Sequence, residues 1–249
     1  MSSNNARTAI VTGASKGLGA GIAQALAETG TAVVVNYRTD AQGAERVVTG
    51  ITANGGRAMA VQADVASSDD VRRLFDRARE AYGPVDVLVN NAAVVNFAPL
   101  SDITEDEFQR EMTTNLLGTI LTTQALAAQD DIAAASIINV STAGTVTHPP
   151  YASLYVASKS AVNAFTIVAA KELGPRGIRV NAIMPGPSDT EGSRAMGYAG
   201  SDQEAQAIAA TPLGRTGTPD DYGPLVAFLA SDDARWITGD VILASGGMR

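Results

Sequence analysis

Residues Thr8–Gly19, TAIVTGASKGLG, join a short β-branched run to a turn that contains Gly13, Gly17 and Gly19. Glycine lets the backbone turn sharply and approach a pyrophosphate, and the N–H groups at the start of a following helix stabilise such an anion. A helical pattern over Leu18–Glu28 follows directly. A tight turn without a ligand could use the same residues, because the spacing G-x-x-x-G-x-G differs from the commoner G-x-G-x-x-G fingerprint. The stretch nevertheless predicts a strand, a phosphate-binding turn and a helix.

The same alternation continues along the chain. Short apolar runs such as TAVVVNY, VDVLVN and SIINVS are separated by longer helical patterns, for example over Asp69–Ala81 and Glu105–Ala128. Apolar strands joined by crossover helices indicate a parallel sheet that is covered by helices on both faces. The sequence therefore predicts an α/β fold.

No stretch has the composition of a linker, so we predict one domain over residues 1–249. The one irregular stretch is Pro185–Gln206, which is rich in glycine, serine and aspartate. A long polar segment inside a compact domain is usually a lid or a binding loop. We therefore predict a substrate-loop region over residues 185–215.

Composition narrows the class of protein. The chain has 18 basic and 26 acidic side chains, and its net charge of −8 disfavours nucleic acid and anionic membranes as partners. It has no cysteine, which excludes disulfides, thiolate metal sites and a cysteine nucleophile, and no other metal-ligand cluster suggests itself. The N-terminal MSSNNART has no apolar signal-sequence core, and no run approaches the roughly 18 apolar residues of a membrane span. We expect a cytoplasmic protein.

Tyr155 and Lys159 lie four residues apart in PPYASLYVASKSA, Pro149–Ala161. Residues with this spacing share one face of a helix, so the phenol and the ammonium can reach one point in space. Reduction of a ketone by hydride transfer needs a proton for the developing alkoxide, and a tyrosine made more acidic by a nearby ammonium can supply it. The alternative is a solvated surface pair, against which the glycine turn argues.

The end of the second predicted strand bears on the choice of dinucleotide. Asn36, Tyr37 and Arg38 stand where an acid would bind an adenosine ribose and a base would meet a 2′-phosphate. Lys16 in the glycine turn adds a second cation, and two cations suit a phosphate dianion. The two could also be ordinary solvated bases. We expect NADP(H) rather than NAD(H) as the cofactor.

With the glycine turn and the Tyr155–Lys159 pair, the sequence resembles the short-chain dehydrogenase/reductase family over its whole length. Further motifs follow in the family's order: NNAA, TNLLG, NVSTAG, VNAIMPGPSDT, PLGRTGTPDD and ITGDVILASGG. The resemblance implies a Rossmann-type, doubly wound parallel sheet of about seven strands, nicotinamide chemistry and a homotetramer. Ala93 replaces the family's usual glycine in NNAG, and ASGG replaces VDGG, but neither change removes a catalytic group.

The resemblance also assigns individual residues. Asn115 corresponds to the family's asparagine that sits in a helix kink and assists a proton relay. The hydroxyl that polarises the substrate oxygen is Ser141, which fits a Ser-x-x-Gly pattern, or Thr142, which precedes Tyr155 by the family's usual thirteen residues. Adjacent strand residues point to opposite faces, so we expect only one to serve and favour Ser141. The residues predicted to bind the cofactor are Gly13, Ser15, Lys16, Gly17, Leu18, Gly19, Asn36, Tyr37, Arg38, Asp64, Val65, Asn91, Ala92, Ala93, Tyr155, Lys159, Pro185, Gly186 and Thr190.

Together these features predict an NADP(H)-dependent oxidoreductase that interconverts a small ketone and a secondary alcohol. A 3-oxoacyl-[acyl-carrier-protein] reductase is an alternative. Asp130 and Asp131 stand where positive charge would help an acidic carrier protein to dock, although Lys171 and Arg176 weaken that objection. A dinucleotide-sensing protein without catalysis is a further alternative, but it should lack the tyrosine or the lysine of the pair.

Overall fold

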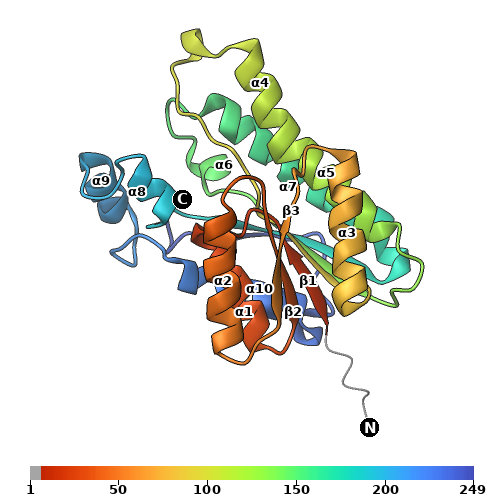
Figure 1. The fold of residues 1–249 in the computed structure, drawn as a ribbon. Coiled ribbons are helices and arrows are strands. Elements are labelled where there is room, and N and C mark those ends of the chain that lie inside the picture. The colour runs from red at the N-terminus through yellow and green to blue at the C-terminus, as the bar shows by residue number, and fades with distance from the viewer. Residues whose placement is uncertain (1–6) are drawn as a thin grey trace.

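A computed structural model describes residues 7–249 of the chain (Figure 1). The stretch MSSNNA, on which part of the signal-sequence prediction rests, lies outside the described residues. The described chain forms a seven-stranded, all-parallel sheet in the order β3-β2-β1-β4-β5-β6-β7, which confirms the Rossmann-type, doubly wound fold. Within residues 7–249, none of the helices combines the length and the apolar character needed to cross a membrane.

The strands are the short β-branched runs of the sequence, and the central ones are buried along their whole length, as expected for a sheet covered on both faces. β1 pairs with β2 on one side and with β4 on the other, so the strand order reverses there. Ligands of open α/β sheets bind beyond the carboxyl ends of the strands at this point. The strands are β1 (Thr8–Val11), β2 (Ala32–Tyr37), β3 (Ala58–Gln62), β4 (Val87–Asn90), β5 (Ala135–Val140), β6 (Ile178–Pro185) and β7 (Val241–Ala244).

Ten α-helices lie within the described residues, and six of them cover the sheet. Alternate strand residues separate two apolar cores: Ala9 and Val11 face α1, α2 and α10, whereas Ile10 faces α3, α5 and α7 (Figure 1). The helices are α1 (Gly17–Glu28), α2 (Ala41–Ala53), α3 (Ser68–Tyr82), α4 (Glu105–Met112), α5 (Gly118–Ala127), α6 (Gly144–Thr147), α7 (Ser153–Leu173), α8 (Glu191–Ala195), α9 (Asp202–Ala210) and α10 (Pro219–Ala230).

The helical pattern predicted over Glu105–Ala128 is interrupted by a π-helical turn, η2 (Thr113–Leu117), between α4 and α5. Such turns are rare and are frequent at functional sites. The buried Asn115 lies in this turn. The irregular stretch Pro185–Gln206 contains the short helix α8 and the start of α9, which begin after the capping residues Thr190 and Ser201.

Candidate active site

A cavity of about 240 Å³ opens beside the carboxyl ends of the central strands, where the strand order reverses. It brings together residues from the glycine turn, the loop after β4, the end of β5, α7 and the end of β6. Hollows of about 480 and 410 Å³ lie elsewhere on the molecule, but neither is lined by a residue that the sequence predicts to be catalytic or to bind the cofactor. The lining residues of the 240 Å³ cavity are Lys16, Leu18, Gly19, Asn91, Ala93, Val140, Ser141, Thr142, Tyr155, Lys159, Pro185, Gly186, Ser188 and Thr190.

The glycine turn needs glycine for a geometric reason. Gly13 and Gly17 have φ angles of 60° and 58°, in the left-handed region that favours glycine. A Cβ atom on Gly13 would also lie 2.9 Å from the Cα of Ala92. The amide of Asn91 ties the two segments together, because its Nδ2 donates to the carbonyls of Thr12 and Gly13 at 2.9 and 3.0 Å. The turn is thus fixed against the loop that follows β4.

Asn36 and Arg38 at the end of β2 take different positions. Asn36 is 1% exposed. Its Oδ1 accepts from the Gly13 N–H at 3.2 Å, and its Nδ2 donates to the Ala63 carbonyl at 3.0 Å. Asn36 therefore braces the glycine turn and does not face solvent. The Arg38 guanidinium is exposed and lies 3.7 Å from the Asp64 carboxylate. The cation predicted at this strand end is thus at the surface, beside Asp64 in the loop after β3.

Tyr155 and Lys159 both point into the cavity from α7. Lys159 is 2% exposed; its Nζ donates to the Val140 carbonyl at 2.8 Å and lies 6.0 Å from the centre of the Tyr155 ring. Burial lowers the pKa of Lys159 to about 8. Burial also raises the pKa of Tyr155 to about 12; the hydroxyl of Thr142 lowers that pKa, and the carboxyl of Glu111 raises it further. The sequence suggested that the ammonium makes the phenol more acidic, but burial is the largest influence on the pKa of both groups here, and it disfavours the charged form of each.

Ser141 and Thr142 lie at the end of β5 with different surroundings. Ser141 is 3% exposed, and its Oγ donates to the main-chain carbonyl of Lys159 at 3.3 Å. The Thr142 hydroxyl instead lines the same cavity as the phenol of Tyr155, lowers the pKa of that phenol and accepts from the Gly144 N–H at 3.1 Å. Neighbouring strand residues point in opposite directions, as expected. Both residues line the cavity, so both hydroxyls that the sequence put forward lie at the candidate site.

Asn115 connects the loop after β4 to the helix that carries the tyrosine. Its Oδ1 accepts from the Val94 N–H at 2.8 Å, and its Nδ2 donates to the Val94 carbonyl at 2.9 Å and to the Ser158 Oγ at 3.0 Å. The Ser158 Oγ in turn donates to the Tyr155 carbonyl at 2.8 Å. Asn115 thus lies at a junction of α7 and the loop, outside the cavity lining.

Several residues of the predicted set lie outside the cavity. Asp64 caps a turn, because its Oδ1 accepts from the Ala66 N–H at 3.0 Å, and Val65 is buried with its side chain close to Gly118. Ser188, which the sequence analysis did not single out, lines the cavity and is hydrogen-bonded to the Tyr222 hydroxyl at 2.8 Å. The sequence feature that could have identified Ser188 as a site residue is the motif PGPSDT, which contains it. The predicted residues that do not line the cavity are Gly13, Ser15, Gly17, Asn36, Tyr37, Arg38, Asp64, Val65, Ala92 and Asn115.

Known proteins resemble this chain along almost its entire length. The sequence model of a family described as Enoyl-(Acyl carrier protein) reductase matches residues 13–249. An uncharacterised oxidoreductase of Methylorubrum extorquens is 51% identical, with 100% of both chains covered. A versicolorin reductase of Emericella nidulans is 37% identical, with 97% of this chain and 95% of the relative covered. The crystal structure of a short chain dehydrogenase from Burkholderia cenocepacia in complex with NADP superimposes with a TM-score of 0.91 at 36% identity, covering 98% of each chain.

Proposed function

The chain belongs to the short-chain dehydrogenase/reductase family of oxidoreductases, and from this premise we propose that it uses NADP(H) to interconvert a ketone and a secondary alcohol. One observation carries the proposal. The phenol of Tyr155, the hydroxyl of Thr142 and the buried amine of Lys159 line the same cavity as the glycine turn. A proton donor, a hydroxyl that can hold the substrate oxygen and a dinucleotide-binding turn therefore meet at one place.

The cavity fits a nicotinamide dinucleotide. The left-handed glycines Gly13 and Gly17 let the backbone approach a pyrophosphate closely, and α1 begins at Gly17 without a side-chain cap on its first N–H groups. The bound dinucleotide would supply or accept the hydride. A related chain of 36% identity was crystallised with NADP, which supports the same cofactor here.

Tyr155 would act on the proton of the substrate oxygen. Its raised pKa of about 12 keeps the phenol protonated at neutral pH, which suits donation to an alkoxide during ketone reduction. Thr142 would donate its hydroxyl hydrogen to the same oxygen. Lys159 and Asn115 would hold α7 and the loop after β4 in place around the Tyr155 phenol. The region 185–215, with α8 and α9 at one edge of the molecule, would cover the substrate (Figure 1).

The activity is tested with a panel of ketones assayed for NADPH oxidation, with NADH alongside. The panel would include small aliphatic and cyclic ketones and a 3-oxoacyl thioester. Turnover of at least one free ketone supports the proposal. NADPH binding without turnover of any member would favour the dinucleotide-sensing alternative. The homotetramer and the cytoplasmic location stay predictions; sedimentation of the purified protein tests the first.

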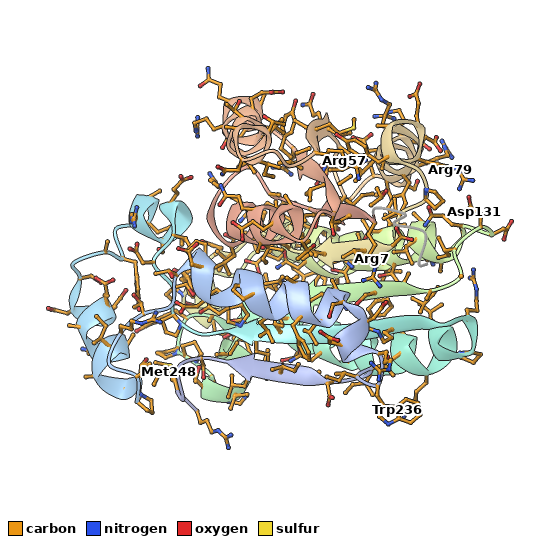
Figure 2. The ribbon with its side chains drawn as sticks, turned by 90° about the horizontal axis from the view of Figure 1, so that it is seen from below. Arg7, Arg57, Arg79, Asp131, Trp236 and Met248 are labelled. Atoms are coloured by element: carbon orange, nitrogen blue, oxygen red, sulfur yellow. The ribbon has the colours of Figure 1, made fainter. Side chains whose placement is uncertain are left out.

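The 3-oxoacyl thioester in the panel tests the alternative function, reduction of a 3-oxoacyl group bound to an acyl-carrier protein. The name of the matching family, Enoyl-(Acyl carrier protein) reductase, also refers to such a carrier. Asp131, in the loop between α5 and β5, forms an ion pair with Arg79 at 2.6 Å, and the two side chains lie side by side in Figure 2. Arg176 binds the main-chain carbonyls of Ala127 and Gln129. Asp131 and Arg176 are thus committed to contacts within the fold, which supports a free substrate over one that is bound to an acidic carrier protein. A free ketone remains the favoured substrate.

Removal of Lys16 and Arg38 should change the cofactor preference. We expect the Lys16→Ala/Arg38→Ala variant to lose roughly 10²- to 10⁴-fold in kcat/KM for NADPH, because it removes two charge-assisted contacts that are each worth about 1.5–3 kcal/mol. The value for NADH should stay nearly constant. Arg77→Ala on the exposed face of α3 is the matched control. Equal losses with both dinucleotides would remove the argument for a 2′-phosphate site.

Thr142 and Ser141 are distinguished by parallel alanine variants. We expect Thr142→Ala to lower kcat by about 10²-fold, the usual cost of removing a donor to a developing oxyanion. Ser141→Ala should lower kcat less than tenfold and reduce thermal stability, because it deletes a hydrogen bond to the carbonyl of Lys159. Steady-state kinetics and melting temperatures give both readouts. A larger kinetic effect in Ser141→Ala would return the role to that residue.

A further inference from the structure

Glu111 is a buried carboxyl that the proposed chemistry does not use. Its side chain is 0% exposed, and no ion pair among residues 7–249 includes it. One oxygen, Oε1, accepts from the Asn96 N–H at 2.8 Å. The other, Oε2, is buried and has no hydrogen-bond partner among the described residues. A buried, unpaired carboxyl costs stability, so its presence next to a candidate active site calls for a functional explanation.

Glu111 belongs to a row of three polar side chains that hold one loop. Glu107, Glu111 and Asn115 are four residues apart, so they share a face of the helical segment formed by α4 and η2. Asn115 binds both main-chain groups of Val94, and Glu111 binds the N–H of Asn96. Glu107 binds the side-chain amide of Asn96. This row fixes the path of the chain directly after Ala93, a residue of the cavity lining.

Glu111 also acts electrostatically on the acid–base site. α4 packs against α7, and the Glu111 carboxyl is among the groups that raise the pKa of Tyr155. On its own helix the carboxyl faces Glu107, which raises its pKa, and Arg110, which lowers it. Burial is the largest influence and raises the pKa of Glu111. On α7, burial alone lowers the pKa of Lys159, so the lysine is not the counter-ion of Glu111.

We propose that Glu111 is a positioning residue of this active site: it fixes residues 94–96 beside the cavity, and it places a buried carboxyl on the helix that packs against α7. The proposal rests on the proposed role of Tyr155 as the acid. A carboxyl is ionised in the alkaline range where a phenol titrates, even when its pKa is raised. The buried carboxylate then opposes formation of a second negative charge on Tyr155. A neighbouring ammonium would lower the pKa of Tyr155, whereas the Glu111 carboxylate raises it. Glu111 therefore favours Tyr155 as a proton donor over Tyr155 as a proton acceptor.

The Glu111→Gln variant separates charge from shape. Glutamine has the same size and still offers an oxygen to the Asn96 N–H, but it carries no charge. We expect the phenol of Tyr155 to lose its proton at a lower pH in this variant. The basic limb of the kcat/KM profile for ketone reduction should therefore move to lower pH. Glu105→Gln, an exposed carboxylate on the same helix, is the matched control.

A direct titration tests the electrostatic effect without turnover. Difluorotyrosine is incorporated at position 155 of the native, Glu111→Gln and Glu105→Gln proteins, and its ionisation is followed by fluorine NMR. The phenol of difluorotyrosine is more acidic than that of tyrosine, so the titration stays within the pH range in which the fold is stable. We expect Glu111→Gln to lower the midpoint by at least about 0.5 pH unit, a threefold change in the ionisation ratio at fixed pH. An unchanged midpoint, or an equal shift in Glu105→Gln, overturns this part of the proposal. Because the NMR signal needs no substrate, it stays informative even if the ketone panel shows no activity.

The positioning effect has its own readout. Hydrogen exchange of the amides at residues 94–96 should be unchanged in Glu111→Gln and at least tenfold faster in Glu111→Leu, which removes the acceptor of the Asn96 N–H. Melting temperatures identify any global loss of structure in Glu111→Leu, and exchange of the β5 amides serves as the internal reference. Equal exchange at 94–96 in all three proteins overturns the positioning role.

Discussion

Tyr155→Phe should lower kcat for ketone reduction by about 10²–10⁴-fold, the usual contribution of a positioned general acid. The ring stays in place, so the Kd for NADPH should change by less than about twofold, because the variant removes one oxygen and no charge at neutral pH. Steady-state kinetics and fluorescence titration with NADPH give the two values.

Tyr82→Phe is the matched control for this experiment. Tyr82 is the last residue of α3 and does not line the cavity. We expect it to leave kcat within about twofold of the native value, within the range of substitutions away from special features. If Tyr155→Phe retained more than a tenth of the native kcat, the proton would have to come from another group. If it lost NADPH binding as well, Tyr155 would act in cofactor binding rather than in proton transfer.

The fold could be predicted from the sequence because its determinants are local. The β-branched runs, the helix patterns between them and the glycines of the turn act within short stretches, and Gly13 and Gly17 adopt the left-handed conformation that makes glycine necessary. The parallel pairing follows once each strand is joined to the next by a crossover helix, whereas the number of about seven strands came from the family resemblance. The pair of Tyr155 and Lys159 could be recognised for the same reason, since four-residue spacing on a helix fixes their common face.

The remainder of the site depends on contacts between distant segments. The sequence kept Ser141 and Thr142 as candidate hydroxyls with a preference for Ser141, and their different surroundings depend on contacts with α7 that the sequence does not show. Asn36 appeared to face the ribose, and the structure shows it bracing Gly13 and β3. Glu111 gave no local signal except its spacing from Asn115. These roles require knowledge of which loops meet at the sheet edge.

The ionisation of the Tyr155–Lys159 pair could not be derived from spacing either. Proximity of an ammonium alone would make the phenol more acidic, whereas burial raises the pKa of Tyr155 and lowers that of Lys159. Each group resists its charged form because the cavity wall removes water from both. At neutral pH the Tyr155 phenol is thus protonated, and the charged form of the neighbouring Lys159 destabilises the fold. That cost has a measurable consequence for stability.

Lys159→Met should abolish ketone reduction and stabilise the protein at neutral pH. The pKa of Lys159 is 10.5 in the unfolded chain and about 8 in the fold. Below pH 8 the protonated amine therefore lowers the free energy of unfolding by about 3 kcal/mol. Methionine fills a similar volume without charge, but it loses the hydrogen bond to the Val140 carbonyl, worth about 1 kcal/mol. We expect a net gain of about 2 kcal/mol at pH 7, or about 4–8 °C in melting temperature for a chain of this size.

The sign of the pH dependence makes this prediction specific. Between pH 8 and 10.5 the unfolded chain binds more protons at Lys159 than the folded chain does, so the native protein gains stability as the pH rises. Lys159→Met lacks this gain, and its advantage over the native protein should shrink through that interval and vanish or reverse above it. Tyr155 is present in both proteins, so its titration cancels in the difference. Melting temperatures of both proteins at pH 7 and pH 10 check the result. An advantage that does not change with pH would mean that the amine is not buried in its charged form, because only proton uptake by the unfolded chain ties the difference to pH.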